Sequence, residues 1–277
     1  MSGPPRRQVD AGLPVAMFDS GVGGMTVLHE CLVSLPQEDF VYLGDTALFP
    51  YGGRDPEQLR RRVGRIAALL LERGAKLLVI ACNTATSVAA DVAREEAAAH
   101  GVEVVPVVEP QAEIAAAITA SGRVGVLATP NTVRSGAYRR ALEAQGRELE
   151  VTEVEAPRLA PFIQNGSPFD ESVVEMARSY CRPLQRAQVD TLILGCTHYP
   201  LVAPMLQRIL GRDVRLVSGG HAVAAAVQRS LERDGLGREP GGEGNYEFLC
   251  TGEAEAFREV GTRFLQMPLG RVERVEL

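Results

Sequence analysis

Four short apolar segments of the chain recur in the same order further along the sequence. The segment at Val15 (VAMFDS) matches the segment at Val124 (VGVLAT) with an offset of 109 residues. The segments at Val41 and near Val104 recur with an offset of 110 residues, and a fourth pair, described below, is 114 residues apart. Any chain of alternating strands and helices can be aligned roughly to itself. A nearly constant offset across four strands nevertheless favours an internal duplication, far longer than a solenoid repeat.

Short apolar runs alternate with longer segments of helical periodicity along most of the chain. Strands are expected at 15–18, 40–43, 77–81, 102–108, 124–127, 150–154, 192–195, 214–217, 246–250 and near 272. Helices are expected at 26–35, 56–73, 86–100, 112–119, 134–145, 171–187, 201–210, 221–233 and 253–265. This alternation predicts parallel sheets with right-handed crossovers.

The duplication and the alternation together predict two similar three-layer α/β/α domains with mainly parallel sheets, related by internal pseudo-symmetry. Residues 1–108 plus 218–277 are expected to form the first domain, because the last segment is too short to fold alone. Residues 109–217 are expected to form the second domain, and residues 1–13 a disordered tail. Open α/β sheets bind ligands at the carboxyl ends of their strands, so the active site is expected in the cleft between the halves.

A cysteine follows a short apolar run at an equivalent place in each half. Cys82 follows LLVIA and Cys196 follows LILG. A single cysteine in such a place is more often an inert core residue. Two thiols that face one cleft suit acid–base chemistry at a carbon centre, because one removes a proton and the other returns one to the opposite face. The helix N-terminus after each turn is expected to lower the thiol pKa.

Each of these cysteines has a candidate partner for proton transfer. His198 lies two residues after Cys196, and Asp19 lies on the loop after the first strand, in the same half as Cys82. Asp19 could instead serve only as a helix N-cap. The four side chains could also ligate zinc, although their spacing lacks the close pairs of a structural site. The glycine-rich loop 20–24 lacks the spacing and the lysine of a nucleotide-binding motif.

Composition excludes several classes of function. A net charge of −6 argues against nucleic acid or an anionic membrane as the main partner. No apolar stretch is long enough to span a membrane, and the N-terminus lacks the apolar region of a secretory signal. Five cysteines without a CxxC motif fit free thiols in the cytoplasm. Lys76, the only lysine, starts a strand at the end away from the expected site, so a pyridoxal phosphate Schiff base is disfavoured.

The remaining cysteines and one run of arginines have structural interpretations. Cys31, Cys181 and Cys250 lie in segments expected to be helices or a strand, and we expect them in the core. The arginines at 60–62 are expected to form a solvated helix face.

Five motifs of the chain can be considered together: FDSGVGGMTV at 18–27, PYG at 50–52, ACNTAT at 81–86, TVRSGAY at 132–138 and LGCTHYPL at 194–201. Together they resemble the glutamate racemase family, cofactor-independent members of the Asp/Glu racemase superfamily. They occur in the order and spacing of the family. The resemblance implies an enzyme that interconverts L- and D-glutamate without a cofactor or metal and supplies D-glutamate for peptidoglycan.

The resemblance also implies roles for individual residues. Cys82 would take the α-proton from D-glutamate and Cys196 from L-glutamate, and the opposite thiol would then protonate the other face. Asp19 and His198 occupy the places of the residues that assist the two cysteines. The positions that correspond to substrate-binding residues are Asp19, Ser20, Pro50, Tyr51, Gly52, Asn83, Thr84, Thr129, Thr132, Thr197 and His198.

One residue departs from the family pattern. Members usually have a glutamate that supports the histidine, two residues before a glycine, and this chain has Gln164 there. A neutral amide can orient His198 but cannot stabilise an imidazolium as a carboxylate would. We therefore expect altered proton transfer on the Cys196 side.

Two other functions stay open at this point. One is racemisation of aspartate or another amino acid by a member of the same superfamily. The other is a thiol-based zinc-binding or redox module without catalysis on amino acids. The oligomeric state does not follow from the sequence, and a homodimer is compatible with the resemblance.

Overall fold

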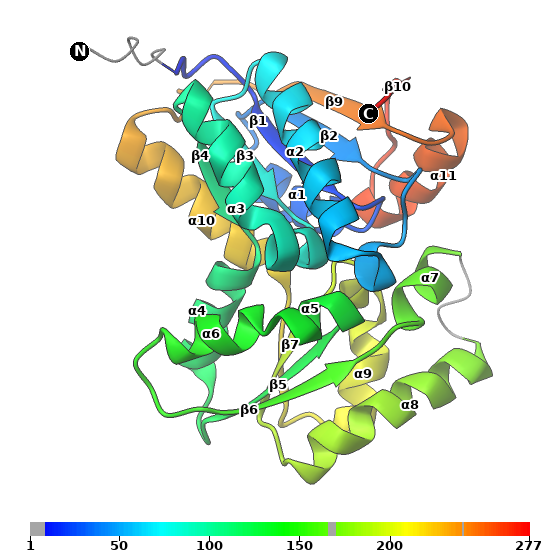
Figure 1. Ribbon diagram of the computed structural model, residues 1–277. Coiled ribbons are helices and arrows are strands. Elements are labelled where there is room, and N and C mark those ends of the chain that lie inside the picture. Colours follow the sequence, from blue (N-terminus) through cyan, green and yellow to red (C-terminus); the bar gives the residue numbers. More distant parts are fainter. Residues whose placement is uncertain (1–8, 166–169, 240) are drawn as a thin grey trace.

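The computed structural model describes residues 9–165, 170–239 and 241–277, which form two parallel sheets (Figure 1). The strands are β1 (Val15–Asp19), β2 (Phe40–Gly44), β3 (Leu77–Ile80), β4 (Glu103–Pro106), β5 (Arg123–Ala128), β6 (Glu150–Glu155), β7 (Thr191–Gly195), β8 (Arg215–Val217), β9 (Tyr246–Cys250) and β10 (Val272–Arg274). The first sheet has the order β10-β9-β2-β1-β3-β4, and the second has the order β6-β5-β7-β8.

Helices follow most of the strands, as the alternation predicts. They are α1 (Met25–Ser34), α2 (Pro56–Glu72), α3 (Asn83–His100), α4 (Val108–Ile118), α5 (Pro130–Ser135), α6 (Ala137–Glu143), α7 (Leu159–Gln164), α8 (Glu171–Arg186), α9 (Ala203–Leu210), α10 (Gly219–Asp234) and α11 (Ala254–Leu265). Two short 3₁₀ helices are η1 (Tyr51–Gly53) and η2 (Tyr199–Val202). Among the helices that the structure describes, none has the length and apolar character needed to cross a bilayer.

The two sheets repeat one topology. The order β2-β1-β3-β4 in the first sheet corresponds strand for strand to β6-β5-β7-β8 in the second. This correspondence confirms the prediction of two similar α/β halves. The segment after residue 218 adds β9 and β10 beside β2 and so completes the first sheet. The proposed domain boundaries, after residues 108 and 217, fall between strands of different sheets.

Both faces of the first sheet are covered by helices, which explains why its strands are apolar throughout. Val15 and Met17 of β1 belong to the apolar cluster beneath α1 and α10, which continues into the second half. Ala16 and Phe18 point to the other face and belong to the cluster beneath α2 and α3. This alternation follows from the two-residue period of a strand. Cys31, Cys181 and Cys250 are buried in the core, as predicted.

The structure differs from the predicted elements at several places. The strand expected at 102–108 ends at Pro106, and α4 begins at Val108 rather than at residue 112. Helix α3 begins at Asn83, directly after the cysteine, rather than at Thr86. The helix predicted at 134–145 is divided into α5 and α6 at Gly136, whose φ of 66° is left-handed. Helix α7 was not expected, because it is short and contains a proline.

The expected disordered tail is only partly covered by the structure. Residues 1–8 lie outside the described residues. Residues 9–13 form a turn, and the carbonyl of Ala11 accepts a hydrogen bond from Lys76 Nζ (2.8 Å). The expectation is therefore wrong for residues 9–13, because the only lysine of the chain holds them against the first sheet.

Lys76 forms an ion pair with Glu38 in which both side chains are fully buried. The other carboxylate oxygen of Glu38 accepts a hydrogen bond from the backbone N–H of Arg238 (2.7 Å). The pair lies just before β3, at the end of the strand away from its cysteine. Removing one partner of a buried ion pair lowers the free energy of unfolding more than replacing both partners, because one buried charge is left unpaired.

We expect Lys76→Met to lower the free energy of unfolding by about 3–5 kcal/mol, because Glu38 keeps a buried charge. The double variant Lys76→Met/Glu38→Gln removes both charges and keeps an oxygen for the N–H of Arg238. It should therefore be more stable than Lys76→Met. Urea denaturation of the three proteins checks this, and equal losses in the two variants would contradict it.

Candidate active site

The residues that follow the carboxyl ends of β1, β3, β5 and β7 line one cavity of about 20 Å³. The first half contributes Ser20, 50–52 and 82–84, and the second half contributes Thr129 and 196–198. Parallel α/β sheets bind ligands at this edge. A cavity of this size holds about one water molecule and is smaller than an amino acid. The structure therefore shows the site closed.

Three of the predicted site residues, Asp19, Thr132 and Gln164, do not line the cavity. Each is hydrogen-bonded to a residue that does line it. Phe49 and Ala160 complete the lining and were not predicted. Phe49 could have been found because it directly precedes the PYG motif, whereas nothing in the sequence marks Ala160.

Cys82 occupies the N-cap position of α3, and its Sγ accepts a hydrogen bond from the backbone N–H of Ala85 (3.4 Å). Burial raises the pKa of the Cys82 thiol to about 12, and the charge of Asp19 acts in the same direction. Hydrogen bonds from Ala85 and Ser20 oppose this rise. The predicted lowering of the thiol pKa is therefore wrong for the closed site, because the helix N-terminus does not offset the loss of water around a thiolate.

Asp19 is a buried carboxylate that contacts both halves. It accepts hydrogen bonds from the backbone N–H of Gly21 (3.1 Å) and from the hydroxyl of Thr197 in the second half (3.2 Å). Burial raises the pKa of the Asp19 carboxyl, and the N–H groups of Gly24 and Gly21 oppose that rise. The neighbouring Cys82 thiol also favours the charged carboxylate and so opposes the rise in the pKa of Asp19. Asp19 is thus placed to exchange a proton with this thiol.

His198 connects the second cysteine to Gln164. Cys196 Sγ lies 3.8 Å from His198 Nδ1, and His198 Nε2 lies 2.9 Å from Gln164 Oε1. An amide oxygen can only accept a hydrogen bond. The ring proton of His198 is therefore on Nε2, and this N–H donates a hydrogen bond to Gln164 Oε1. Nδ1 then has a free lone pair that faces the Cys196 thiol. The arrangement makes His198 a proton acceptor for Cys196.

The imidazole of His198 packs against two phenylalanine rings. Its centroid is 5.4 Å from that of Phe49 and 5.2 Å from that of Phe264. Burial lowers the pKa of His198 to about 3. Burial also raises the pKa of the Cys196 thiol, and the charge of Asp19 adds to this. Thiol and imidazole are therefore both neutral in the closed site.

Hydroxyl groups join the two halves beside the cavity. Thr84 Oγ1 in the first half lies 2.8 Å from Thr129 Oγ1 in the second, which lies 3.0 Å from Thr132 Oγ1. The hydroxyl of Thr26 donates to the carbonyl of Thr197 across the same junction (3.0 Å). Each hydroxyl can donate to a carboxylate or accept from an ammonium group. These hydroxyl groups can therefore replace the hydrogen bonds among themselves by hydrogen bonds to a bound amino acid.

Gln111 on α4 is a buried amide that the sequence analysis missed. Its Oε1 accepts hydrogen bonds from Asn83 Nδ2 (3.0 Å) and from the Tyr138 hydroxyl (2.5 Å). Its Nε2 donates to the carbonyls of Leu194 (3.2 Å) and Val217 (3.3 Å), which lie at the carboxyl ends of β7 and β8. One side chain thus ties the residue after the first cysteine to the strand before the second. The sequence around Gln111 gave no clear signal, because Glu109 and Glu113 flank it in the same helix.

The PYG loop is hydrogen-bonded to a second buried carboxylate, that of Asp45, on the side away from the cavity. The Tyr51 hydroxyl donates to Asp45 Oδ2 (2.5 Å), and Thr251 donates to Oδ1 (2.6 Å). Arg62 donates to both oxygens, at 2.8 and 2.6 Å. The predicted solvated face at 60–62 is therefore wrong for Arg62. Its guanidinium is needed to balance a charge that lies out of water.

The glycine-rich loop 20–24 allows the two halves to approach closely. A Cβ atom on Gly23 would lie 2.4 Å from both His198 Nδ1 and Thr197 Oγ1. The loop thus contacts the second half of the chain, where a nucleotide-binding loop would need free space for phosphate. In the described parts of the chain, no three His, Cys, Asp or Glu side chains are arranged to hold a metal ion. The zinc hypothesis therefore lacks a ligand set there.

Comparison with known proteins places this geometry in a family. Residues 26–227 match the family model described as Asp/Glu/Hydantoin racemase. The chain is 42% identical over 263 residues to the glutamate racemase of Geobacter metallireducens, which covers 95% of this chain and 96% of that protein.

Solved structures agree with this result. The crystal structure of a glutamate racemase isoform from Bacillus anthracis is similar with a TM-score of 0.90 and 32% identity, over 96% of this chain and 98% of that one. Glutamate racemase from Francisella tularensis, in complex with D-glutamate, is similar with a TM-score of 0.89 and 29% identity, over 96% and 98% of the two chains. The chain belongs to the Asp/Glu/hydantoin racemase family.

Proposed function

We propose that this protein interconverts L-glutamate and D-glutamate, with Cys82 and Cys196 as the two acid–base groups and no cofactor. The observation that carries the proposal is that two thiols, one after β3 and one after β7, line the same cavity. Each thiol has its own neighbour for proton transfer. The similar proteins described above are glutamate racemases, and one of their structures contains D-glutamate.

In the direction from L- to D-glutamate, the Cys196 thiolate takes the α-proton. The Cα–H bond breaks, an S–H bond forms on Cys196, and the electron pair stays on the α-carbon. Cys82 then gives its S–H proton to the opposite face of that carbon and is left as a thiolate. The reverse direction exchanges the two roles. Protons and charge balance in each direction, so the reaction needs no oxidant or reductant.

The thiolate has to form in a site that disfavours it, since burial raises the pKa of both thiols. Substrate binding lowers the pKa of an adjacent thiol again, because the α-ammonium group brings a positive charge into the closed site and favours a thiolate. The proton of Cys196 can move to Nδ1 of His198 at 3.8 Å. On the other side, the carboxylate of Asp19 can accept the proton of Cys82. The two acid–base groups are thus activated by different neighbours.

The cavity lining contains hydroxyl, amide, thiol and backbone groups, and no arginine or lysine lines it within the described residues. The substrate carboxylates are therefore held by neutral donors in this proposal. The backbone N–H groups of Tyr51 and Gly52 supply part of them, whereas Pro50 has no backbone N–H. The side chains proposed to bind the substrate are those of Ser20, Asn83, Thr84, Thr129, Thr132 and Thr197.

The cellular setting is part of the same proposal. D-Glutamate from this enzyme would serve peptidoglycan synthesis. The five cysteines are free thiols in the structure, and a reducing cytoplasm preserves them in that state. A homodimer is not required for the chemistry, because a single chain provides both thiols.

The substrate assay separates glutamate from aspartate. Without pyridoxal phosphate and with EDTA present, we expect racemisation of L-glutamate and loss of deuterium from its α-position. Aspartate should be at least about tenfold slower, because it is one methylene shorter. Circular dichroism and mass spectrometry measure the two events. Faster turnover of aspartate would assign the protein to that substrate, and inhibition by EDTA would favour the metal hypothesis.

Removing either thiol should stop racemisation. We expect Cys82→Ala and Cys196→Ala each to lower kcat by about 10²–10⁴ or more, because each removes one acid–base group. Cys181→Ala is the matched control, since this cysteine is equally buried but lies in α8 outside the cavity. It should retain the kcat of the wild type. Retained turnover in either cleft variant would contradict the two-thiol assignment.

Gln164→Glu tests the neutral partner of His198. In the wild type, burial holds the pKa of His198 at about 3, so the imidazole stays neutral at neutral pH. A carboxylate in place of Gln164 Oε1, 2.9 Å from Nε2, would raise this pKa. Below the raised pKa the imidazolium can no longer accept a proton from Cys196. We expect kcat from L- to D-glutamate to fall with decreasing pH in this variant.

The measurement is kcat against pH in both directions. The enantiomers have equal free energies in water, so kcat/KM is equal in the two directions and the difference has to appear in kcat. Gln58→Glu, at an exposed glutamine on α2 outside the cavity, is the control for the added charge. Superimposable profiles of wild type and Gln164→Glu in both directions would contradict the role assigned to Gln164.

A further inference from the structure

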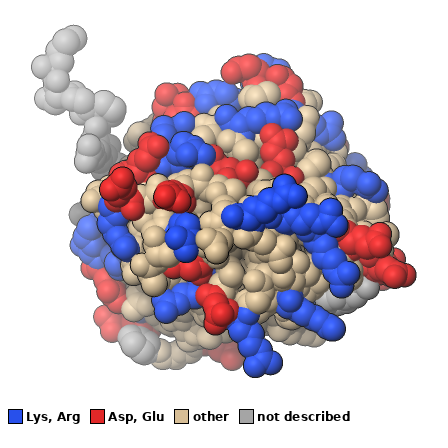
Figure 2. Space-filling view, turned by 90° about the horizontal axis from the view of Figure 1, so that it is seen from below, with Lys and Arg blue, Asp and Glu red and all other residues tan. Residues whose placement is uncertain are grey.

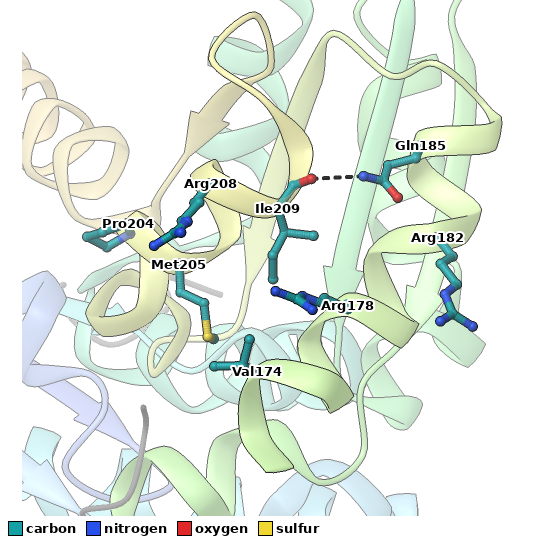
Figure 3. Close-up of a pocket in the computed structure, with 8 residues that line it drawn as sticks. All are labelled: Val174, Arg178, Arg182, Gln185, Pro204, Met205, Arg208 and Ile209. Atoms are coloured by element: carbon teal, nitrogen blue, oxygen red, sulfur yellow. Dashed lines mark hydrogen bonds between the residues drawn. The ribbon is translucent and has the colours of Figure 1, made fainter. Parts of the chain in front are cut away.

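A groove of about 770 Å³ lies between α8 and α9 at the outer surface of the second half (Figure 3). Its apolar part is formed by Val174 on α8 and by Pro204, Met205 and Ile209 on α9. It shares no lining residue with the active-site cavity. A concave, mainly apolar surface of this volume is in the range that proteins use for small molecules.

The two walls of the groove are fixed before any ligand binds. Helix α8 buries its opposite face in the core of the second half. The side-chain amide of Gln185 on α8 donates a hydrogen bond to the carbonyl of Ile209 on α9 (2.8 Å), the dashed line in Figure 3. A ligand therefore meets a shape that already exists, which reduces the entropy cost of binding.

Three arginines border this groove. Arg178 and Arg208 lie next to its apolar part, and Arg182 stands farther out on α8 (Figure 3). Within the described residues, none of the three pairs with a carboxylate, unlike Arg60, which is paired with Asp91. The underside of the molecule shows basic side chains beside a largely uncharged surface (Figure 2). In a chain with a net charge of −6, this local excess of positive charge is unusual.

We propose that the groove binds a small anion that carries an apolar group, such as an aryl or alkyl carboxylate or phosphate monoester. The guanidinium groups of Arg178 and Arg208 would hold the anionic group, since their planar donors match carboxylate and phosphate oxygens. The apolar group would cover Met205 and Ile209 and remove their surface from water. Glutamate does not belong to this class, because it has polar groups at both ends.

The groove is connected to the active site through short elements. Helix α9 begins directly after η2, and η2 directly follows His198. Helix α7, which ends at Gln164, packs against both η2 and α8. A ligand in the groove would therefore contact α8 and α9, which adjoin the elements that carry Gln164 and His198.

Anilinonaphthalene sulfonate is a suitable probe, because it combines apolar rings with one anionic group and fluoresces in apolar surroundings. We expect saturable binding of one molecule per chain to the wild-type protein in a fluorescence titration. The double variant Arg178→Glu/Arg208→Glu replaces attraction by repulsion and should weaken binding by at least about tenfold. Thermal melting of each variant shows that the fold is retained, as expected for exposed positions.

The matched control is Arg186→Glu/Arg212→Glu, which makes the same change in net charge at two exposed arginines outside the groove. It should bind the probe as the wild type does. Equal weakening in both double variants would show a general charge effect and overturn the proposal. Absence of saturable binding to the wild type would also overturn it, and so would displacement of the probe by saturating L-glutamate.

A second copy of the chain is the other occupant to be tested. Sedimentation of the wild type and both double variants shows whether this face is a subunit interface. The proposal expects the oligomeric state to be the same in all three. A dimer that dissociates only in Arg178→Glu/Arg208→Glu, together with no probe binding, would assign the groove to the interface and overturn the proposal.

Discussion

The loss of water around ionisable groups governs the chemistry of this site. Burial raises the pKa of both cleft thiols and lowers that of His198 to about 3, so these groups are neutral when the site is closed. The carboxylate of Asp19 is as deeply buried and adds to the rise. A site that holds its thiols protonated protects them from oxidation and metals, since thiolate is the reactive form. In the proposed mechanism, the positive charge of the substrate's ammonium group is then needed to form the thiolate.

The pseudo-symmetry of the fold sets the positions of the thiols but not their surroundings. The repeated strand order brings the turns after β3 and β7 to one cavity. Cys82 has a carboxylate beside it, whereas Cys196 has a neutral imidazole supported by the amide of Gln164. The repeated fold therefore accounts for two thiols at one cavity, which are the two acid–base groups of the proposed mechanism. Because the neighbours of the two thiols differ, the thiols need not respond alike to pH.

The sequence predicted those parts of the molecule that depend on local patterns. The strands, the two similar halves and the cysteine turns follow from periodicity and a constant offset, and most lining residues follow from motifs. The failures concern contacts between distant segments. Arg62 looks like a surface residue until Asp45 is placed beside it, and Gln111 acquires its role only where β7 and β8 meet Asn83. The thiol pKa also depended on burial, which no local pattern encodes.

The volume of the closed cavity has a consequence for the time course of catalysis. A space that holds about one water molecule cannot admit or release an amino acid, so each turnover includes an opening and a closing of the two halves. Opening has to break the hydrogen bonds that join Thr84 to Thr129 and Asp19 to Thr197. Motions of this kind occur in microseconds to milliseconds. In the proposed mechanism, the bonds that keep the carbanion away from solvent are therefore the same bonds that have to break before the product can leave.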